Sequence, residues 1–187
     1  MTDTTLNHPP IADRGIRHKA IRAALKVSFP GVKFSVTGSR GTGYGWSQVE
    51  WTDGPKESAV RALTDKFFGS SFNGMTDGYD STGNYFVWQG VTYAAGGSGC
   101  NTSRRISPSY ARVLLVRVAE EYGIPEAERP TIVERLNYLG RPEWDIKDTE
   151  GRDAGTRPVY PGADGRQDWL TMVYRASQGS YPFDSEG

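Results

Sequence analysis

Nucleophilic or zinc-based chemistry in this chain would have to use one cysteine and two histidines, because the sequence contains no others. A thiolate at Cys100 needs a histidine base beside it. His8 lies in a polar, proline-containing stretch and His18 lies on a predicted helix, so the sequence favours neither as that base. One cysteine and two histidines also fall short of the four ligands of a typical zinc site. We therefore expect a protein that binds rather than catalyses, with no catalytic residue, metal or cofactor.

Two groups of carboxylates are further candidates for chemistry. Asp77 and Asp80 lie in a glycine-rich stretch and can in principle bind a hard cation. Aspartate is also a common turn residue, and we favour that interpretation. Glu120 and Glu121 are adjacent on a predicted helix, where consecutive positions do not face each other. Neither pattern predicts a metal site or an acid–base pair.

The clearest signal is a basic segment near the N-terminus. Lys plus Arg and Asp plus Glu each total 22 over the chain, yet residues 14–49 contain no acidic residue. The cations of this segment are Arg14, Arg17, Lys19, Arg22, Lys26, Lys33 and Arg40. An uninterrupted run of one charge is typical of a surface that meets phosphate groups or an acidic protein. We take all of them except Arg14 as candidates for binding nucleic acid or a protein partner.

A helix must position the first part of this segment. Apolar spacing predicts a helix over residues 15–28, which Pro30 ends. The face that we expect to be buried consists of Ile16, Ala20, Ala23, Ala24 and Val27. Lys19, Arg22 and Lys26 are neighbours on the other face. Two interpretations stay open: the solvated face of an ordinary amphipathic helix, or a ridge that contacts phosphates.

A β-hairpin follows, with alternating apolar residues predicting strands over residues 32–37 and 46–51. The connection between the strands contains four glycines, so we expect a pliable arm. It carries Arg40 and Tyr44 and leads into Trp46. A cation and two aromatic rings can stack on bases or enter a groove. The same residues also fit a loop tip without a binding role.

A second glycine-rich arm is predicted over residues 95–105, ending in Arg104 and Arg105. Ser107 followed by proline is a strong helix-start signal, which predicts a helix over residues 108–122. The arginine pair would then precede a helix N-terminus, where the backbone favours anions. A phosphate contact and an ordinary exposed loop both remain possible for this pair.

The remaining patterns indicate an α+β fold. We expect a helix–β-hairpin–helix core, extended by one or two antiparallel strands and two or three C-terminal helices. The other predicted elements are a helix over 56–68, a turn-rich stretch over 69–84, a strand or hairpin over 85–93 that extends the first sheet, and helices over 131–139 and 168–177. We expect the 131–139 helix to cover Val113 and Val116 on the far side of the preceding helix.

The composition suggests how these elements group. We expect a flexible leader over residues 1–14, one α+β domain over 15–139, and an extended segment with a short helix over 140–187. No run approaches the roughly 20 apolar residues of a membrane span, and the N-terminus lacks the apolar core of a secretory signal. A single cysteine fits a reducing compartment. A cytoplasmic location without membrane contact is therefore expected.

Several stretches resemble a known family. The stretches are AIRAALKVSFPGVKFSV, VEWTDGP, FNGMTDGYD and, less closely, CNTSRRISPSYARVLLVRVAEEYG. In this order, over roughly residues 16–123, the chain resembles the large polyvalent protein-associated domains of phages and conjugative elements, in particular the member numbered twenty-nine. The resemblance implies a module of proteins that enter a recipient cell with mobile DNA and protect it. It carries no catalytic residues that can be transferred to this chain.

Two functions fit these observations. In the first, a non-catalytic accessory protein of a mobile element counters host defence by binding DNA or RNA through its basic face. In the second, the protein inhibits a host defence complex of CRISPR or restriction type by protein contact, through the tryptophan and tyrosine residues that dominate interfaces. The chain is neutral with a basic face, so mimicry of DNA, which requires a strongly acidic surface, is disfavoured. Exposed aromatics also leave a homo-oligomer possible.

Overall fold

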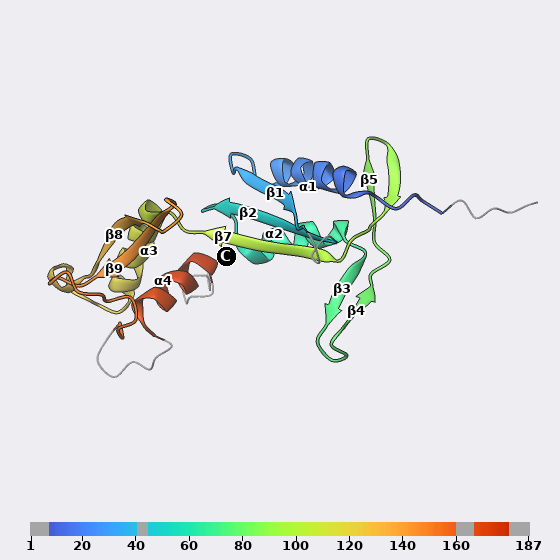
Figure 1. Cartoon of the computed structure of the whole chain (residues 1–187). Helices are drawn as coiled ribbons and strands as arrows, with labels where there is room; N and C mark the ends of the chain where they lie inside the picture. Colours follow the sequence, from blue (N-terminus) through green and yellow to red (C-terminus); the bar gives the residue numbers. More distant parts are fainter. Residues whose placement is uncertain (1–7, 41–44, 160–166, 180–187) are drawn as a thin grey trace, which may run out of the picture. The chain divides into compact units, whose positions relative to one another are not determined.

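The computed structural model describes residues 8–40, 45–159 and 167–179. The chain divides into two compact units, Met1–Arg104 and Arg105–Gly187. Residues 105–139, which the sequence analysis groups with the N-terminal elements, belong to the second unit in this division. The α+β class is confirmed, with antiparallel hairpins and helices in both units (Figure 1). In the described part of the chain, no helix combines the length and apolar character that crossing a bilayer requires.

The first unit opens with the predicted helix–hairpin–helix order. Its elements are α1 (Arg14–Ser28), β1 (Phe34–Gly38), β2 (Trp46–Thr52), α2 (Glu57–Thr64), a 3₁₀ turn (Asp65–Phe67), β3 (Ser70–Asn73), β4 (Gly78–Ser81), β5 (Tyr85–Trp88), β6 (Val91–Ala94) and β7 (Gly99–Arg105), whose last residue begins the second unit. Asp13 starts α1 by accepting a hydrogen bond from the Ile16 amide. The helix ends before Pro30, because the proline ring disfavours helical geometry at the residue before it.

The sheet of the first unit has the order β1-β2-β7. β1 and β2 are antiparallel, in register from Phe34↔Trp51 to Gly38↔Ser47. The amide of Ser98, just before β7, donates to the carbonyl of Gly45, just before β2. The side chain of Arg104, near the end of β7, donates to the carbonyl of Asp53, just after β2. The two strands therefore start at the same end of the sheet, so β7 runs parallel to β2. The prediction of a second glycine-rich arm is wrong for residues 99–105, because this stretch completes the sheet.

The two short hairpins do not join this sheet (Figure 1). β3 and β4 pair with each other within the stretch that the sequence analysis assigned to turns. β5 and β6 form the hairpin expected over residues 85–93, but the prediction that it extends the first sheet is wrong. Its tight turn has positive φ at Gln89 (49°) and Gly90 (79°), as two-residue hairpin turns of this hand require.

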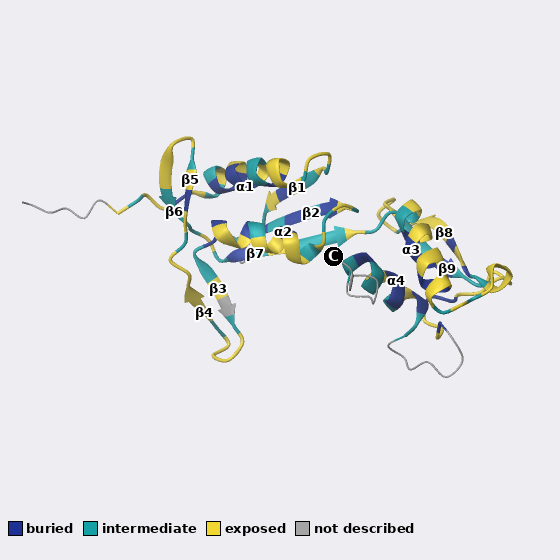
Figure 2. Cartoon of the chain, turned by 180° about the vertical axis from the view of Figure 1, so that it is seen from behind, coloured by how far each residue is buried: buried dark blue, intermediate teal, exposed yellow. Residues whose placement is uncertain are grey.

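The core of the first unit lies between the sheet and the two helices. Val36 and Val49 face each other across the strands and join Ile21 and Leu25 of α1 and Val60 of α2. All five are at most 2% exposed. The predicted buried face of α1 is wrong in part: Ala20 is buried, but Val27 is 83% exposed. The helix is rotated so that Ile21 and Leu25 contact the sheet, and buried and exposed residues alternate within its turns (Figure 2).

The second unit packs two helices against one hairpin. It contains α3 (Pro108–Glu121), a 3₁₀ turn (Glu126–Glu128), β8 (Thr131–Leu136), β9 (Pro142–Lys147) and α4 (Trp169–Gln178). Both helices begin where predicted, capped by Ser107 and Asp168. The core includes Leu114 and Val118 of α3 with Ile132 and Ile146 of the hairpin.

Residues 131–139 are the clearest error of the sequence analysis. Residues 131–136 of this stretch form strand β8, paired in antiparallel register with β9, and no helix forms here. β9 lies in a stretch that was expected to be an extended linker. Val113 and Val116, which we expected the 131–139 helix to cover, are 54% and 40% exposed. The hairpin packs on the opposite side of α3, against Leu114 and Val118.

Candidate functional site

The outer side of α1 carries the exposed part of the basic segment. Lys19, Arg22 and Lys26 are all exposed there, as predicted. A helix of 15 residues extends over about 22 Å. Lys33 precedes β1 and Arg40 follows it, and both are exposed. We call these five residues the basic ridge.

Hydrogen bonds fix the orientation of α1 relative to the edge strand β1. Arg14, at the start of the helix, donates to the carbonyl of Ser39 (3.2 Å), just beyond the end of the strand. Arg22, two turns further, donates to the carbonyl of Val36. Helix and strand therefore run antiparallel, with Arg40 near one end of α1 and Lys33 near the other. In the described part of the chain, Lys19, Lys26, Lys33 and Arg40 make no hydrogen bond or ion pair.

Arg17 is not part of this exposed surface. It is only 4% exposed, and its guanidinium lies 5.1 Å from the centre of the Phe68 ring. Gly96 and Gly97 pack against it so closely that a Cβ at Gly97 would lie 2.7 Å from an Arg17 nitrogen. Arg17 lies one helical turn before Ala20 and Ile21, and this spacing places it on the buried face.

The remaining predicted residues are also separated from the ridge. Arg104 lies on β7, at the sheet edge opposite β1, and donates to the backbone carbonyls of Asp53 and Gly54. It holds β7 to the turn after β2 rather than preceding a helix in a free loop. Arg105 is exposed and begins the second unit. Tyr44 lies outside the described residues.

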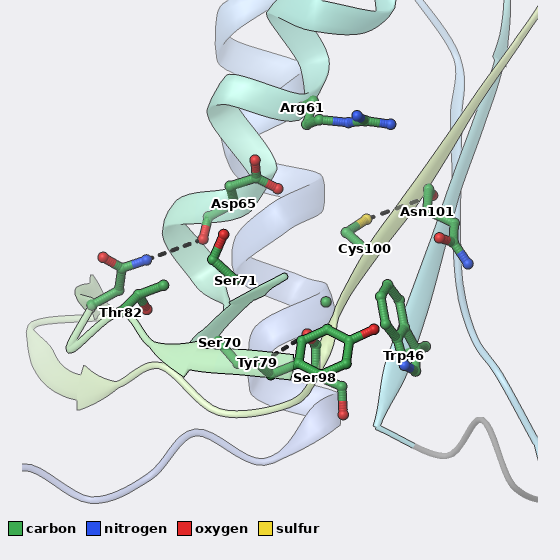
Figure 3. Close-up of a pocket in the computed structure, with 12 residues that line it drawn as sticks. Trp46, Arg61, Asp65, Ser70, Ser71, Tyr79, Thr82, Ser98, Cys100 and Asn101 are labelled. Carbon is green, nitrogen blue, oxygen red and sulfur yellow. Dashed lines mark hydrogen bonds between the residues drawn. The ribbon is translucent and has the colours of Figure 1, made fainter. Parts of the chain in front are cut away.

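Trp46 borders a cleft of about 640 Å³ at the β7 edge of the first unit. Its ring lies on Gly99, where a Cβ would come within 2.8 Å, and meets the Tyr79 ring edge-on at 5.9 Å between centroids. Arg61 and Asp65, from α2 and the turn after it, line the cleft across from these rings, beside β7 (Figure 3). Partial burial raises the pKa of Asp65, and the positive charge of Arg61 opposes this shift.

The sequence analysis missed this cleft because its walls come from segments far apart in the chain. No periodicity connects Trp46, Arg61, Tyr79 and Asn101. The available signal was local and weak: a glycine at position 99, which lets an aromatic ring lie flat on a strand.

Cys100 also lines this cleft, and its chemistry is that of a structural thiol. Burial raises its pKa to about 11, so it is protonated at neutral pH and a poor nucleophile. Its sulfur is near the backbone carbonyl of Asn101 (3.7 Å), and His18 bonds a different residue. Among the residues that the structure describes, no three or more His, Cys, Asp or Glu side chains are grouped to hold a metal ion.

His18 joins α1 to the sheet through a buried hydrogen bond. Its Nε2 lies 2.9 Å from the Ser47 hydroxyl, and Ser47 is fully buried. Burial, with the positive charges of Arg17, Arg22 and Arg14, lowers the pKa of His18 from its ordinary value. The imidazole is therefore neutral in the folded protein, and a buried serine cannot reach a substrate.

This pair predicts a pH dependence of stability. Below about pH 6.5 the unfolded chain protonates His18 while the folded chain does not, so the free energy of unfolding decreases as the pH falls toward the lowered pKa of the folded state. His18→Gln keeps a hydrogen-bonding side chain without titration. Thermal unfolding followed by circular dichroism at about pH 7.5 and about pH 5.5 should show a larger decrease in melting temperature for the wild type than for this variant. Equal decreases would contradict the prediction.

The first unit is thus an α+β module in which two helices and a three-stranded sheet enclose one core. Residues 16–111, just over half of the chain, match the sequence model of the family described as large polyvalent protein associated domain 29, and the chain belongs to this family. Comparisons with curated proteins and with solved structures found no match.

Proposed function

We propose that this protein is a non-catalytic accessory protein of a mobile genetic element, which counters host defence by binding DNA or RNA through the basic ridge. The observation that carries this proposal is the row of exposed cations along α1 and at both ends of β1. Four of the five ridge residues make no bond within the described part of the chain, so their charge is available to phosphates. Membership of the family supports a role beside mobile DNA.

Salt dependence tests the ridge most directly. Each phosphate contact adds about 0.7 to 0.9 to the slope of log affinity against log salt concentration. Replacing Lys19 and Lys26 by glutamine should therefore weaken binding and reduce that slope by about 1.4 to 1.8. Fluorescence anisotropy with labelled single- and double-stranded oligonucleotides, over a range of salt concentrations, measures both quantities.

The matched control removes the same charge elsewhere. Lys66 and Arg141 are exposed and lie outside the ridge, so the Lys66→Gln, Arg141→Gln double variant should keep the wild-type slope. If wild-type protein binds neither oligonucleotide even at low salt, the proposal is wrong. If both double variants reduce the slope equally, net charge and not the ridge is responsible.

A second candidate function, inhibition of a host defence complex by protein contact, is favoured by the tip of the β8–β9 hairpin. Leu136, Tyr138 and Leu139 are 68%, 93% and 57% exposed there. The turn is held in one conformation, because the Asn137 side-chain oxygen accepts the amides of Leu139 (2.9 Å) and Arg141 (3.0 Å). A pre-organised apolar tip is typical of a protein-binding element.

Replacing the three tip residues by serine tests this second function. If the protein inhibits a purified CRISPR-type or restriction nuclease, the triple variant should lose at least about tenfold in inhibition, the effect of about 1.4 kcal/mol. Its oligonucleotide binding should not change. Val113→Ser with Val116→Ser is the control, because these side chains are also exposed and apolar but lie on α3. Equal losses in both variants would contradict a role of the tip.

A further inference from the structure

The two edges of the β1-β2-β7 sheet differ in what lies against their outward-facing backbone groups. At the β1 edge, the arginine side chains of α1 donate to the carbonyls of Val36 and Ser39, which occupies backbone groups that another strand would use. On the side of β7 away from β2, no strand among the described residues pairs with β7. That edge forms part of the 640 Å³ cleft instead, which Gly99, Cys100 and Asn101 line. An edge strand beside an open cleft offers every second N–H and C=O group for pairing.

The walls of the cleft suit an extended chain. Ser71 of β3 and Asn101 of β7 supply a hydroxyl and an amide group for backbone contacts, whereas the Ser70 hydroxyl already donates to the carbonyl of Ser98 (2.7 Å). The Trp46 and Tyr79 rings provide a surface for an apolar side chain at one end (Figure 3). A second hollow of about 460 Å³ adjoins the cleft at Arg61 and Asp65, and residues of α2 and the turn after it line it. We call the cleft, together with this extension over α2, the groove.

The charge of the groove favours a basic occupant. The charged residues that line it are Glu57, Arg61 and Asp65, so its carboxylates outnumber its cations by one. On the helix wall, Arg61 is paired with Glu57 at 3.4 Å, whereas the Asp65 carboxylate accepts no hydrogen bond within the described part of the chain. A nucleic-acid backbone would bring phosphates toward this net negative charge. A lysine or arginine side chain would instead meet Asp65 as an ion pair.

We propose that the groove between β7 and α2 binds an extended, basic peptide segment of another protein, which adds a strand to the β7 edge and places a lysine or arginine at Asp65. Backbone pairing supplies affinity, and the Asp65 carboxylate and the Trp46–Tyr79 pair select side chains. This inference does not depend on the basic ridge. The ridge and the groove carry opposite charge, so one module can hold a polyanion and a basic peptide at the same time.

The experiment uses a displayed library of random twelve-residue peptides, selected on the full chain. The expected result is enrichment of peptides that contain Lys or Arg beside apolar residues. Synthetic copies should bind the Asp65→Asn variant at least tenfold more weakly than the wild type, whereas Glu121→Gln, which removes an exposed carboxylate on α3, should bind as the wild type does.

Strand addition has a further signature that does not require a change in the protein. The backbone amides of the peptide can be N-methylated in two alternating sets, at the odd-numbered or at the even-numbered positions. Methylation of one set should abolish binding and methylation of the other should not, because only every second N–H faces β7. Hydrogen exchange at β7 amides should slow when the peptide binds. Equal effects of methylating the two sets, or no enrichment of peptides in the selection, would overturn the proposal. So would competition for the groove by a single-stranded oligonucleotide, or sedimentation showing that a second copy of the chain pairs with β7.

Discussion

Arg17→Ala is expected to lower the free energy of unfolding of the first unit by about 2–5 kcal/mol, as for truncation of a large buried side chain. The residue is 4% exposed, covers the Phe68 ring and fills the space beside Gly97. Removing it leaves a cavity between α1 and the segment that leads into β7. Urea denaturation followed by tryptophan fluorescence measures the loss.

The matched control is Lys19→Ala, two residues further along the same helix. Lys19 is exposed, so its truncation should change the free energy of unfolding by less than about 0.5 kcal/mol. Equal effects of the two substitutions would mean that Arg17 is accessible in solution. It would then return to the group of residues that can contact phosphates.

Leu114→Ala is expected to lower the stability of the second unit by about 2–5 kcal/mol and to leave the first unit unchanged. Leu114 is fully buried among Ile132, Ile146 and Met172, all of the second unit. Hydrogen exchange resolved by segment should show faster exchange in β8, β9 and α4, with unchanged protection in β1 and β2.

Its control is Val113→Ala, which removes the same kind of side chain from the neighbouring position. Val113 is 54% exposed, so exchange should change little. Loss of protection in β1 and β2 of the Leu114→Ala variant would show that the two units unfold as one cooperative body. The division at Arg104 would then be geometric only.

The helices were predictable because their signals are local. Asp13, Ser107 and Asp168 each accept an amide of the first helical turn, and Pro30 excludes helix geometry near the end of α1. Local signals are misleading at residues 131–139. Ile132, Leu136 and Leu139 have helical spacing, but the strand is selected by its pairing with β9, which no local pattern reveals.

The candidate sites also divide into residues that local sequence predicts and residues that only tertiary packing brings together. The exposed row of Lys19, Arg22 and Lys26 follows from helical spacing alone. The burial of Arg17 does not follow from its charge, but from its i to i+4 relation with buried Ile21. The groove could not be predicted, because β7 and the β3–β4 hairpin reach α2 only through tertiary packing. Whether an edge strand is available for pairing depends on the elements that pack beside it.

The alkylation rate of Cys100, the single thiol of the chain, can be used to follow the groove. With a pKa raised to about 11 by burial, it should react with iodoacetamide far more slowly than a free cysteine, since alkylation requires the thiolate. The labelling rate therefore reports the surroundings of the Cys100 thiol in the groove. An occupant of the groove should slow the labelling further without any engineered probe.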